Sequence, residues 1–185
     1  YAPSAVPNER FHVMPRPMSR CLIHDVVDGF GDAAVRLREG GLDGVEIVAS
    51  HGYLPAQFLN PNVNLREDEY GGSLENRVRF LREITDNIRS KVGDDFVVGL
   101  RISGDEQSHD GPDIETVVDA IAMLNQGGGL DYFNVIAGSS SSLGGSVHIV
   151  PPMFIETGYV APFSATVKQR VDVPVFVAGR INQPQ

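Results

Sequence analysis

The sequence predicts an α/β fold in which a parallel sheet is covered by helices, and two observations lead to this prediction. Four short segments rich in Val, Ile and Phe have strand character, namely 44–49, 96–102, 131–137 and 173–178. They are nearly continuous in apolar residues rather than alternating, as expected of strands in a parallel sheet. Segments of helical period separate them, and this alternation of helix and strand is typical of right-handed βαβ units.

The helices are justified one by one from their apolar period and their ends. The first helix has an apolar stripe made of Ile23, Val27, Phe30, Ala34 and Leu37. It ends at Gly40-Gly41, where a positive φ costs little. Ser73 can cap the second helix and places Glu75 in a first turn where the helix dipole favours a carboxylate. Asp113 can cap the third, and a shorter fourth helix follows Pro162.

Two architectures share this order of elements, the doubly wound open sheet and the (β/α)8 barrel. A nucleotide-binding doubly wound sheet would carry Gly-x-Gly-x-x-Gly directly after a strand, at the start of a helix. The glycines at 127–129 precede a strand instead. Four units are too few to close a barrel, so the second architecture would be present only in part.

Composition excludes several classes of protein. The 185 residues include 24 Asp+Glu and 15 Lys+Arg, which gives a net charge of −9, and 42% of them are hydrophobic. This balance argues against a nucleic-acid-binding protein and against a disordered tail. The single cysteine, Cys21, and the lack of an apolar run of about 20 residues favour a reduced, cytoplasmic protein without a membrane span. Since residue 1 is Tyr rather than Met, we expect a fragment.

Polar residues follow each predicted strand, and ligands bind at the carboxyl ends of parallel strands in both architectures. His51 and Tyr53 follow the first strand and offer an imidazole that titrates near neutrality beside a phenol that can give up a proton. The alternative is a loop histidine bonded to backbone and a tyrosine with a solvated tip. Arg101 ends the second apolar run and could hold an anion. Its alternative is an ion pair with Glu46, a strand carboxylate that needs a partner.

The remaining candidates have weaker signals. Gly179-Arg180, after the fourth strand, could cradle a phosphate with backbone amides and a guanidinium, or could be a simple turn. His148 lies on the long segment after the third strand, which faces the expected site. His109 lies in a predicted solvated turn, and Cys21 is interpreted as a small, half-buried side chain. We predict no metal ligands.

One stretch resembles a known family. The motifs are Asp43-Gly44-Val45-Glu46-Ile47, His51-Gly52-Tyr53-Leu54, Gln57-Phe58-Leu59-Asn60-Pro61 and Asp68-Glu69-Tyr70-Gly71-Gly72-Ser73-Leu74-Glu75-Asn76-Arg77. Together they closely resemble the Old Yellow Enzyme-like NADH:flavin oxidoreductases. The resemblance implies a (β/α)8 TIM barrel with FMN at the carboxyl mouth. Residues 1–185 would then be a partial FMN-binding barrel domain holding strands four to seven, without the first three or the eighth.

The resemblance also implies roles for individual residues. Arg101 would approach the N1 and O2 edge of the flavin, and Gly179 and Arg180 would hold the FMN phosphate. Tyr53 falls on the proton-donating tyrosine and His51 on a residue that hydrogen-bonds the substrate. The run 68–77 would be architectural and would brace the active-site loop. The resemblance thus implies an FMN-dependent NAD(P)H:flavin oxidoreductase with a small organic substrate.

Val48 separates this chain from simple enone reductases, which carry a histidine at that place. The motif from Leu54 to Pro61 resembles the larger members of the family instead, namely the trimethylamine dehydrogenase, N-demethylase and dienoyl-CoA reductase branch. Amine dehydrogenases place a tyrosine where Val48 stands, so both amine oxidation and enoyl or dienoyl reduction stay open. In that branch the full-length protein also holds a [4Fe-4S] cluster and a domain for FAD or NAD(P)H, and it takes electrons from NAD(P)H or passes them to an electron-transfer partner.

Two further hypotheses belong to other classes. A lyase or aldolase without flavin would need a Schiff-base lysine at a strand end. The two lysines, Lys91 and Lys168, lie in predicted helices instead. A truncated or degenerate barrel that does not bind flavin by itself is the alternative to an enzyme, because the missing strands would supply other contacts to the isoalloxazine ring.

Overall fold

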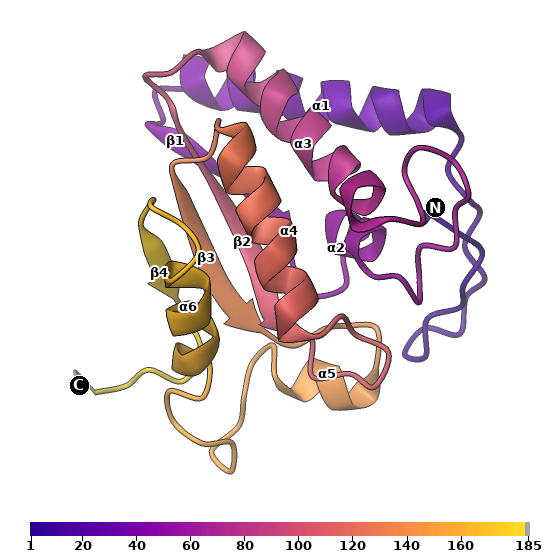
Figure 1. Cartoon of the computed structure of the whole chain (residues 1–185), viewed down its shortest axis with the longest axis vertical. Helices are drawn as coiled ribbons and strands as arrows, with labels where there is room; N and C mark the ends of the chain where they lie inside the picture. Colours follow the sequence, from indigo (N-terminus) through magenta and orange to yellow (C-terminus); the bar gives the residue numbers. More distant parts are fainter. Residues whose placement is uncertain (184–185) are drawn as a thin grey trace.

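The computed structural model describes residues 1–183 and contains one parallel sheet with helices along it (Figure 1). The strands are β1 (Gly44–Ala49), β2 (Val97–Asp105), β3 (Tyr132–Ala137) and β4 (Val175–Val177). The helices are α1 (Arg20–Glu39), α2 (Leu54–Leu59), α3 (Leu74–Val92), α4 (Ile114–Gly127), α5 (Leu143–Val147) and α6 (Ala161–Lys168). None of the helices in the described part of the chain combines the length and the apolar character of a membrane span.

The order of the strands in space decides between the two predicted architectures. The four strands are neighbours in chain order, β1-β2-β3-β4, and all pairs are parallel. A doubly wound sheet reverses its strand order at a switch point, whereas a barrel adds each strand beside the previous one. The long helices α1, α3, α4 and α6 likewise pack in succession, each against the next. The fold is therefore part of a (β/α)8 barrel, as predicted.

The predicted helix starts are confirmed in detail. The Ser73 hydroxyl accepts a hydrogen bond from the Asn76 amide, and the Asp113 carboxylate accepts one from Thr116. Each satisfies an amide that the first turn of a helix leaves unpaired. Ser19 caps α1 in the same way by accepting from Leu22.

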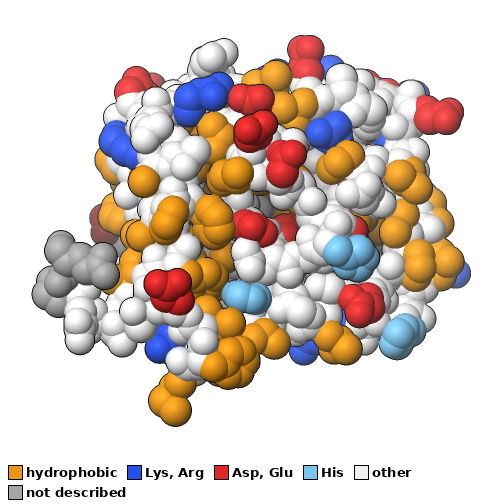
Figure 2. Space-filling view, turned by 60° about the horizontal axis from the view of Figure 1, so that its bottom comes forward, with side chains coloured by type: hydrophobic (Ala, Val, Ile, Leu, Met, Phe, Trp, Pro, Cys, Tyr) orange, Lys and Arg blue, Asp and Glu red, His pale blue; other side chains and the backbone are white. Residues whose placement is uncertain are grey.

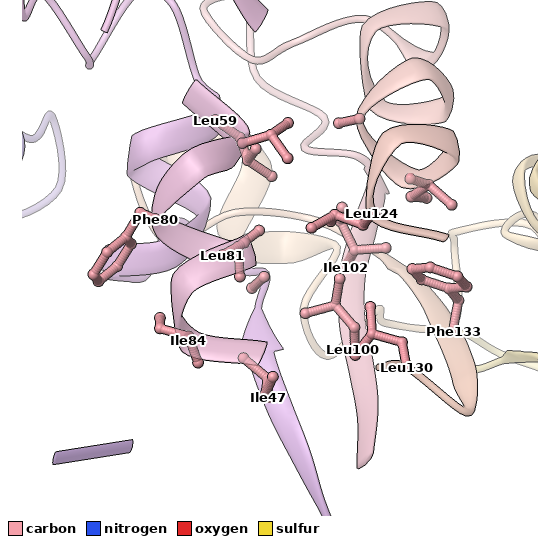
Figure 3. Close-up of a cluster of buried hydrophobic side chains, with 14 of the residues drawn as sticks. Ile47, Leu59, Phe80, Leu81, Ile84, Leu100, Ile102, Leu124, Leu130 and Phe133 are labelled. Atoms are coloured by element: carbon pink, nitrogen blue, oxygen red, sulfur yellow. The ribbon is translucent and has the colours of Figure 1, made fainter. Parts of the chain in front are cut away.

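The hydrophobic core lies between these helices and one face of the sheet (Figure 3). From α3, Leu81 and Ile84 point toward the sheet and are fully buried. Leu100 and Ile102 of β2 and Phe133 of β3 meet them and are at most 2% exposed. Burial of each such side chain contributes about 2 kcal/mol, so this layer is the main source of stability.

Several predictions about the elements were wrong. β2 continues to Asp105, so Arg101 lies in the middle of the strand rather than at its end. Leu37 is 40% exposed and is not part of the buried stripe of α1. The predicted fourth strand is reduced to Val175–Val177. The short helices α2 and α5 were not predicted, since six and five residues are too few to show an apolar period.

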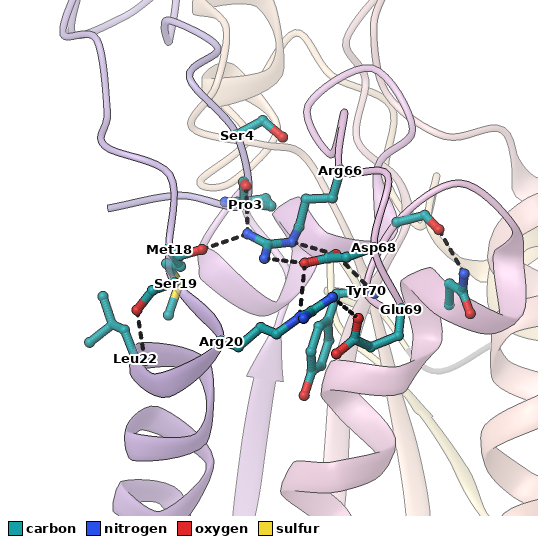
Figure 4. Close-up of polar contacts among 12 residues, drawn as sticks. Pro3, Ser4, Met18, Ser19, Arg20, Leu22, Arg66, Asp68, Glu69 and Tyr70 are labelled. Atoms are coloured by element: carbon teal, nitrogen blue, oxygen red, sulfur yellow. Dashed lines mark hydrogen bonds and ion pairs between the residues drawn. The ribbon is translucent and has the colours of Figure 1, made fainter.

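The N-terminal segment is fastened to the loop before α3 (Figure 4). Arg66 donates from Nη1 to the carbonyls of Pro3 and Met18, and from Nε and Nη2 to the carboxylate of Asp68. Arg20 from α1 also pairs with Asp68, at 3.7 Å. Further along, Arg77 donates to the Leu59 carbonyl at the end of α2. The run 68–77 therefore braces the loop after β1, as the resemblance implied.

Candidate active site at the carboxyl edge of the sheet

The loops after the four strands meet at the edge of the sheet that faces down in Figure 1. We call residues 50–60, 106–113, 138–160 and 178–183 together the loop edge. Figure 2 turns this edge toward the reader and shows acidic and histidine side chains around a hollowed surface with hydrophobic side chains. A cavity of about 500 Å³ lies here, bounded by the N-terminal segment and by the loops after β1, β2 and β3.

His51 is held by its backbone at the start of this edge. Its φ is 58°, a left-handed conformation that is uncommon outside glycine. Its amide donates to the Ser103 hydroxyl, and its carbonyl accepts from both the amide and the hydroxyl of Ser140. These bonds tie the loop after β1 to β2 and to the loop after β3, so the imidazole is placed by three segments.

The imidazole of His51 is half-buried, and its surroundings favour its neutral form over its charged form. Burial lowers the pKa of His51, the nearby Gly138 backbone raises it, and the charge of Arg101 lowers it. Its Nδ1 is buried without a partner in hydrogen-bonding geometry. A neutral imidazole can donate from one nitrogen and accept at the other, which suits it to orient a polar substrate.

Tyr53 lies next to His51 and starts helix α2 as its N-cap. The two rings meet edge to face, with centroids 6.1 Å apart. Tyr53 is 53% exposed and lines the 500 Å³ cavity, together with Phe11 from the N-terminal segment. Its phenol is therefore open to a ligand in the cavity rather than used within the fold.

Arg101 lies on the face of the sheet opposite to the helices. Its register partners are Val48 on β1 and Asn134 on β3. The alternative predicted from sequence is confirmed, because Arg101 Nε lies 2.6 Å from Glu46 Oε1. The contact is an ion pair and not a hydrogen bond, since the Nε–H does not point at the carboxylate. The side chain is 40% exposed, and among residues 1–183 its guanidinium has no hydrogen-bond partner.

Gly179 and Arg180 follow β4, and Arg180 lines a second cavity of about 340 Å³ together with Thr157, Gly158 and the start of α6. Gly179 has a φ of 150°, and a Cβ there would lie 2.3 Å from Val160 Cγ2, so only glycine fits. Arg180 donates from Nη1 to the Pro152 carbonyl, while its Nε is buried and unpaired. The structure therefore brings His51 and Tyr53 together, with the charge of Arg101 near His51, and places Arg180 at a separate cavity.

Sequence reasoning missed Glu106, which is 4% exposed and lines the larger cavity. Burial raises its pKa to about 7, and the charges of Asp110 and Asp105 act in the same direction, against hydrogen bonds from Asn60 and Ser139. Its position directly after a parallel strand was the available signal. Sequence reasoning also missed Tyr132 and Asn134. Their polar side chains in an otherwise apolar strand were the signal that the second face of the sheet carries polar residues.

The other candidates are resolved by their surroundings. His109 is exposed, as predicted, and Cys21 is exposed rather than half-buried. His148 stacks with Tyr159, with ring centroids 5.4 Å apart, and its Nδ1 is buried and unpaired. As far as the structure describes the chain, no three His, Cys, Asp or Glu residues come together as a metal site.

Unpaired buried polar atoms mark the loop edge and the sheet face beside it. Within the described chain they belong to Ser50, His51, Gln57, Arg101, Asn134, His148 and Arg180, and outside this region only to Arg82 and Asn87 on α3. Buried polar atoms are nearly always bonded, so a cluster of exceptions needs an explanation. A ligand with several hydrogen-bonding groups at this edge would supply one.

Comparison with known proteins agrees with this reading. The sequence model of the NADH:flavin oxidoreductase / NADH oxidase family matches residues 2–185. The multifunctional alkene reductase/demethylase OYE of Caballeronia cordobensis is 42% identical over 97% of this chain and 26% of its own. The N,N-dimethylglycine/sarcosine dehydrogenase of Chromohalobacter salexigens is also 42% identical, over 86% of this chain and 23% of its own.

Among solved structures, a 2-naphthoyl-CoA reductase in complex with 2-naphthoyl-CoA superposes with a TM-score of 0.90 at 31% identity. The match covers 99% of this chain and 27% of that one. The chain thus spans about a quarter of the length of these three proteins.

Proposed function

Because this chain belongs to the NADH:flavin oxidoreductase / NADH oxidase family, we propose that it is part of an FMN-dependent oxidoreductase that moves hydride between the flavin and a small organic substrate. The observation that carries the proposal is the cluster of unpaired buried side-chain atoms at the loop edge and on the adjoining sheet face. FMN has a ring rich in hydrogen-bond donors and acceptors, a ribityl chain and a phosphate. It would therefore supply partners for both the charged and the neutral polar side chains of this cluster.

The residues present fit this cofactor. Arg101 offers a half-exposed guanidinium with no hydrogen-bond partner in the described chain, which is suited to an electron-rich edge of a flavin ring. Arg180 offers a buried Nε without a partner and lines the 340 Å³ cavity, and Gly179 before it is bare backbone. We therefore propose that Arg101 holds the ring, and that Gly179 and Arg180 hold the phosphate.

When bound, FMN would supply the hydride chemistry, and the protein would orient the substrate relative to the flavin. His51 is held by three segments of backbone, and its imidazole hydrogen-bonds the substrate and fixes its angle. Tyr53 projects into the 500 Å³ cavity, and its hydroxyl exchanges a proton with the substrate. The lyase alternative gains no support, since Lys91 and Lys168 lie on α3 and α6 rather than at strand ends.

The substrate is proposed at the level of class. Val48 is 36% exposed on the same sheet face as Arg101, and an apolar side chain there cannot grip a carbonyl oxygen. This supports an amine substrate, oxidised or N-demethylated, or an enoyl or dienoyl thioester, over a simple enone. We further propose that residues 1–185 supply barrel strands four to seven of a cytoplasmic protein that exchanges electrons with NAD(P)H or with a [4Fe-4S] cluster and FAD.

The test is the visible spectrum of the full-length protein. A flavin spectrum, retained after gel filtration and released as FMN on denaturation, is expected. A colourless protein that cannot be reconstituted with FMN would refute the proposal. Titration of residues 1–185 alone with FMN separates an independent binding domain from a partial one, and weak or no binding is expected.

A further inference from the structure

A polar network crosses the sheet face that carries Arg101. Its centre is Glu46, whose side chain is 19% exposed on β1. Oε1 faces Arg101 of β2 at 2.6 Å, and Oε2 accepts hydrogen bonds from the Tyr132 hydroxyl at 3.1 Å and from Asn134 Nδ2 at 2.9 Å on β3. One carboxylate therefore joins three strands, and both of its oxygens are used.

Gly99 makes this network possible. It is the register partner of Glu46 on one side and of Tyr132 on the other. A Cβ at Gly99 would lie 2.0–2.4 Å from three ring atoms of Tyr132. The bare backbone thus lets the Tyr132 ring lie across β2 and reach Glu46 on the strand beyond. The far side of the ring meets Phe176 of β4 edge to face, with centroids 5.1 Å apart.

The two oxygens of Glu46 differ in what they do. Oε2 is fixed by two hydrogen bonds, so the carboxylate has little freedom to turn. Oε1 then provides a fixed negative charge for a guanidinium that has no hydrogen-bond partner in the described chain. A long side chain that is 40% exposed would otherwise sample many rotamers. The pair engages the Nε side of Arg101 and leaves the two terminal nitrogens for a ligand.

We propose that Glu46, held by Tyr132 across Gly99 and by Asn134, is the positioning residue that fixes the Arg101 guanidinium for the flavin ring. Its consequence for cofactor binding rests on the proposed function, whereas the restraint on Arg101 is a property of the protein alone. Glu46 thus acts through Arg101 and does not touch the reacting atoms.

Glu46→Gln in the full-length protein tests this proposal, with Glu83→Gln as the matched control. Glu83 also accepts from a tyrosine hydroxyl, that of Tyr70 at 2.8 Å, but lies on α3 away from the loop edge. We expect Glu46→Gln to raise the FMN dissociation constant about tenfold, the equivalent of losing roughly 1.4 kcal/mol, and to shift the flavin midpoint potential. We expect Glu83→Gln to change neither.

A double-mutant cycle separates positioning from general support of the fold. In an Arg101→Met background, Glu46→Gln should change FMN affinity less than about twofold, since there is no guanidinium left to position. An undiminished effect of Glu46→Gln in that background would overturn the proposal. So would an unchanged FMN affinity and potential in the single variant.

The proposed function fails separately, if Arg101→Met leaves FMN affinity unchanged or if the parent protein binds no FMN. In either case the ¹⁵Nε–¹H signal of Arg101 in the cofactor-free protein still decides the positioning role. A signal displaced by the carboxylate 2.6 Å away from the chemical shift of a free arginine is expected in the parent. The displacement should be lost in Glu46→Gln, and equal chemical shifts in both would refute the positioning role. If Glu46→Gln does not fold, Tyr132→Phe keeps the ring and removes one of the two bonds that fix Glu46, and a smaller displacement of the Arg101 signal is expected.

Discussion

Two pairs of arginines differ in what their donors do. Arg66 and Arg89 lie away from the sheet face that carries Arg101, with side chains 10% and 14% exposed. Arg66 bonds two carbonyls and Asp68, and Arg89 bonds three carbonyls and Asp131. Arg101 and Arg180, at the sheet face and the loop edge, each keep a buried Nε without a hydrogen-bond partner.

The difference separates arginines that hold the fold from the two arginines to which we assign a ligand. A guanidinium has five donors, and one that uses most of them on backbone carbonyls and a carboxylate can join segments far apart in sequence. Arg89, for example, joins the end of α3 to the starts of β2 and β3. Leaving such donors unused in a buried place is costly, and proteins accept that cost chiefly at functional sites.

The largest expected effect is on stability, from Arg89→Met. The change removes the hydrogen bonds to the carbonyls of Gly129, Gly93 and Phe96 and one of the two partners of Asp131, which keeps the Val98 amide. We expect the free energy of unfolding to fall by about 3 kcal/mol, because four hydrogen bonds of about 1 kcal/mol each are lost at a side chain that is 14% exposed. Urea denaturation measures it. A loss below about 1 kcal/mol would contradict the distinction between the two pairs.

The second prediction concerns Glu106, a loop-edge carboxyl without an ion-pair partner among residues 1–183. Its pKa is raised from 4.5 to about 7, chiefly by burial. The folded state therefore keeps a proton that the unfolded state releases, so stability falls as the pH rises from about 4.5 to about 7. At pH 8 the loss amounts to about 3 kcal/mol at most.

Glu106→Gln should remove this loss, so that the variant gains stability over the parent at pH 8 and not at pH 4. Thermal unfolding at several pH values measures the difference. Glu67→Gln, at an exposed glutamate, is the matched control and should leave the pH profile unchanged. An equal gain at both pH values would show that Glu106 is not held protonated.

The third prediction concerns the chemistry at the loop edge. Tyr53→Phe keeps a ring that is 53% exposed and lines the cavity, and removes only the hydroxyl. We expect turnover to fall about 100-fold, within the range of general acid–base catalysis, with FMN content and unfolding temperature unchanged. Steady-state kinetics with the preferred substrate measure it, and His109→Gln, in an exposed turn, serves as the control. Unchanged turnover would remove Tyr53 from the mechanism.

Much of the fold could be predicted from the sequence because local signals agree with tertiary ones. Ser73 and Asp113 cap helices through their own side chains, and the apolar run 44–49 coincides with β1. The extension of β2 through Ser103, Gly104 and Asp105 could not be predicted, since those residues have low strand propensity and are held by pairing with β3.

The candidate site was predicted as a set of residues but not as an arrangement. His51, Tyr53 and Arg101 could be named from their positions after or within strands. The ion pair of Arg101 with Glu46 could be named too, but the contacts that hold Glu46 in place could not, because they depend on a glycine two residues before Arg101 that makes room for a tyrosine from another strand. Glu46 and Tyr132 are 86 positions apart, and no local pattern joins them.

The smallest expected effect on stability comes from Arg101→Met, and it sharpens the comparison with Arg89→Met. Arg101 is 40% exposed, and its loss leaves Glu46 with hydrogen bonds from Tyr132 and Asn134. Ion pairs of this exposure contribute about 0–1 kcal/mol, so the free energy of unfolding should fall by no more than about 1 kcal/mol. The same variant should lose most of its FMN affinity. If Arg101→Met destabilised the protein as much as Arg89→Met, both arginines would serve the fold, and the unpaired donors of Arg101 would no longer point to a ligand.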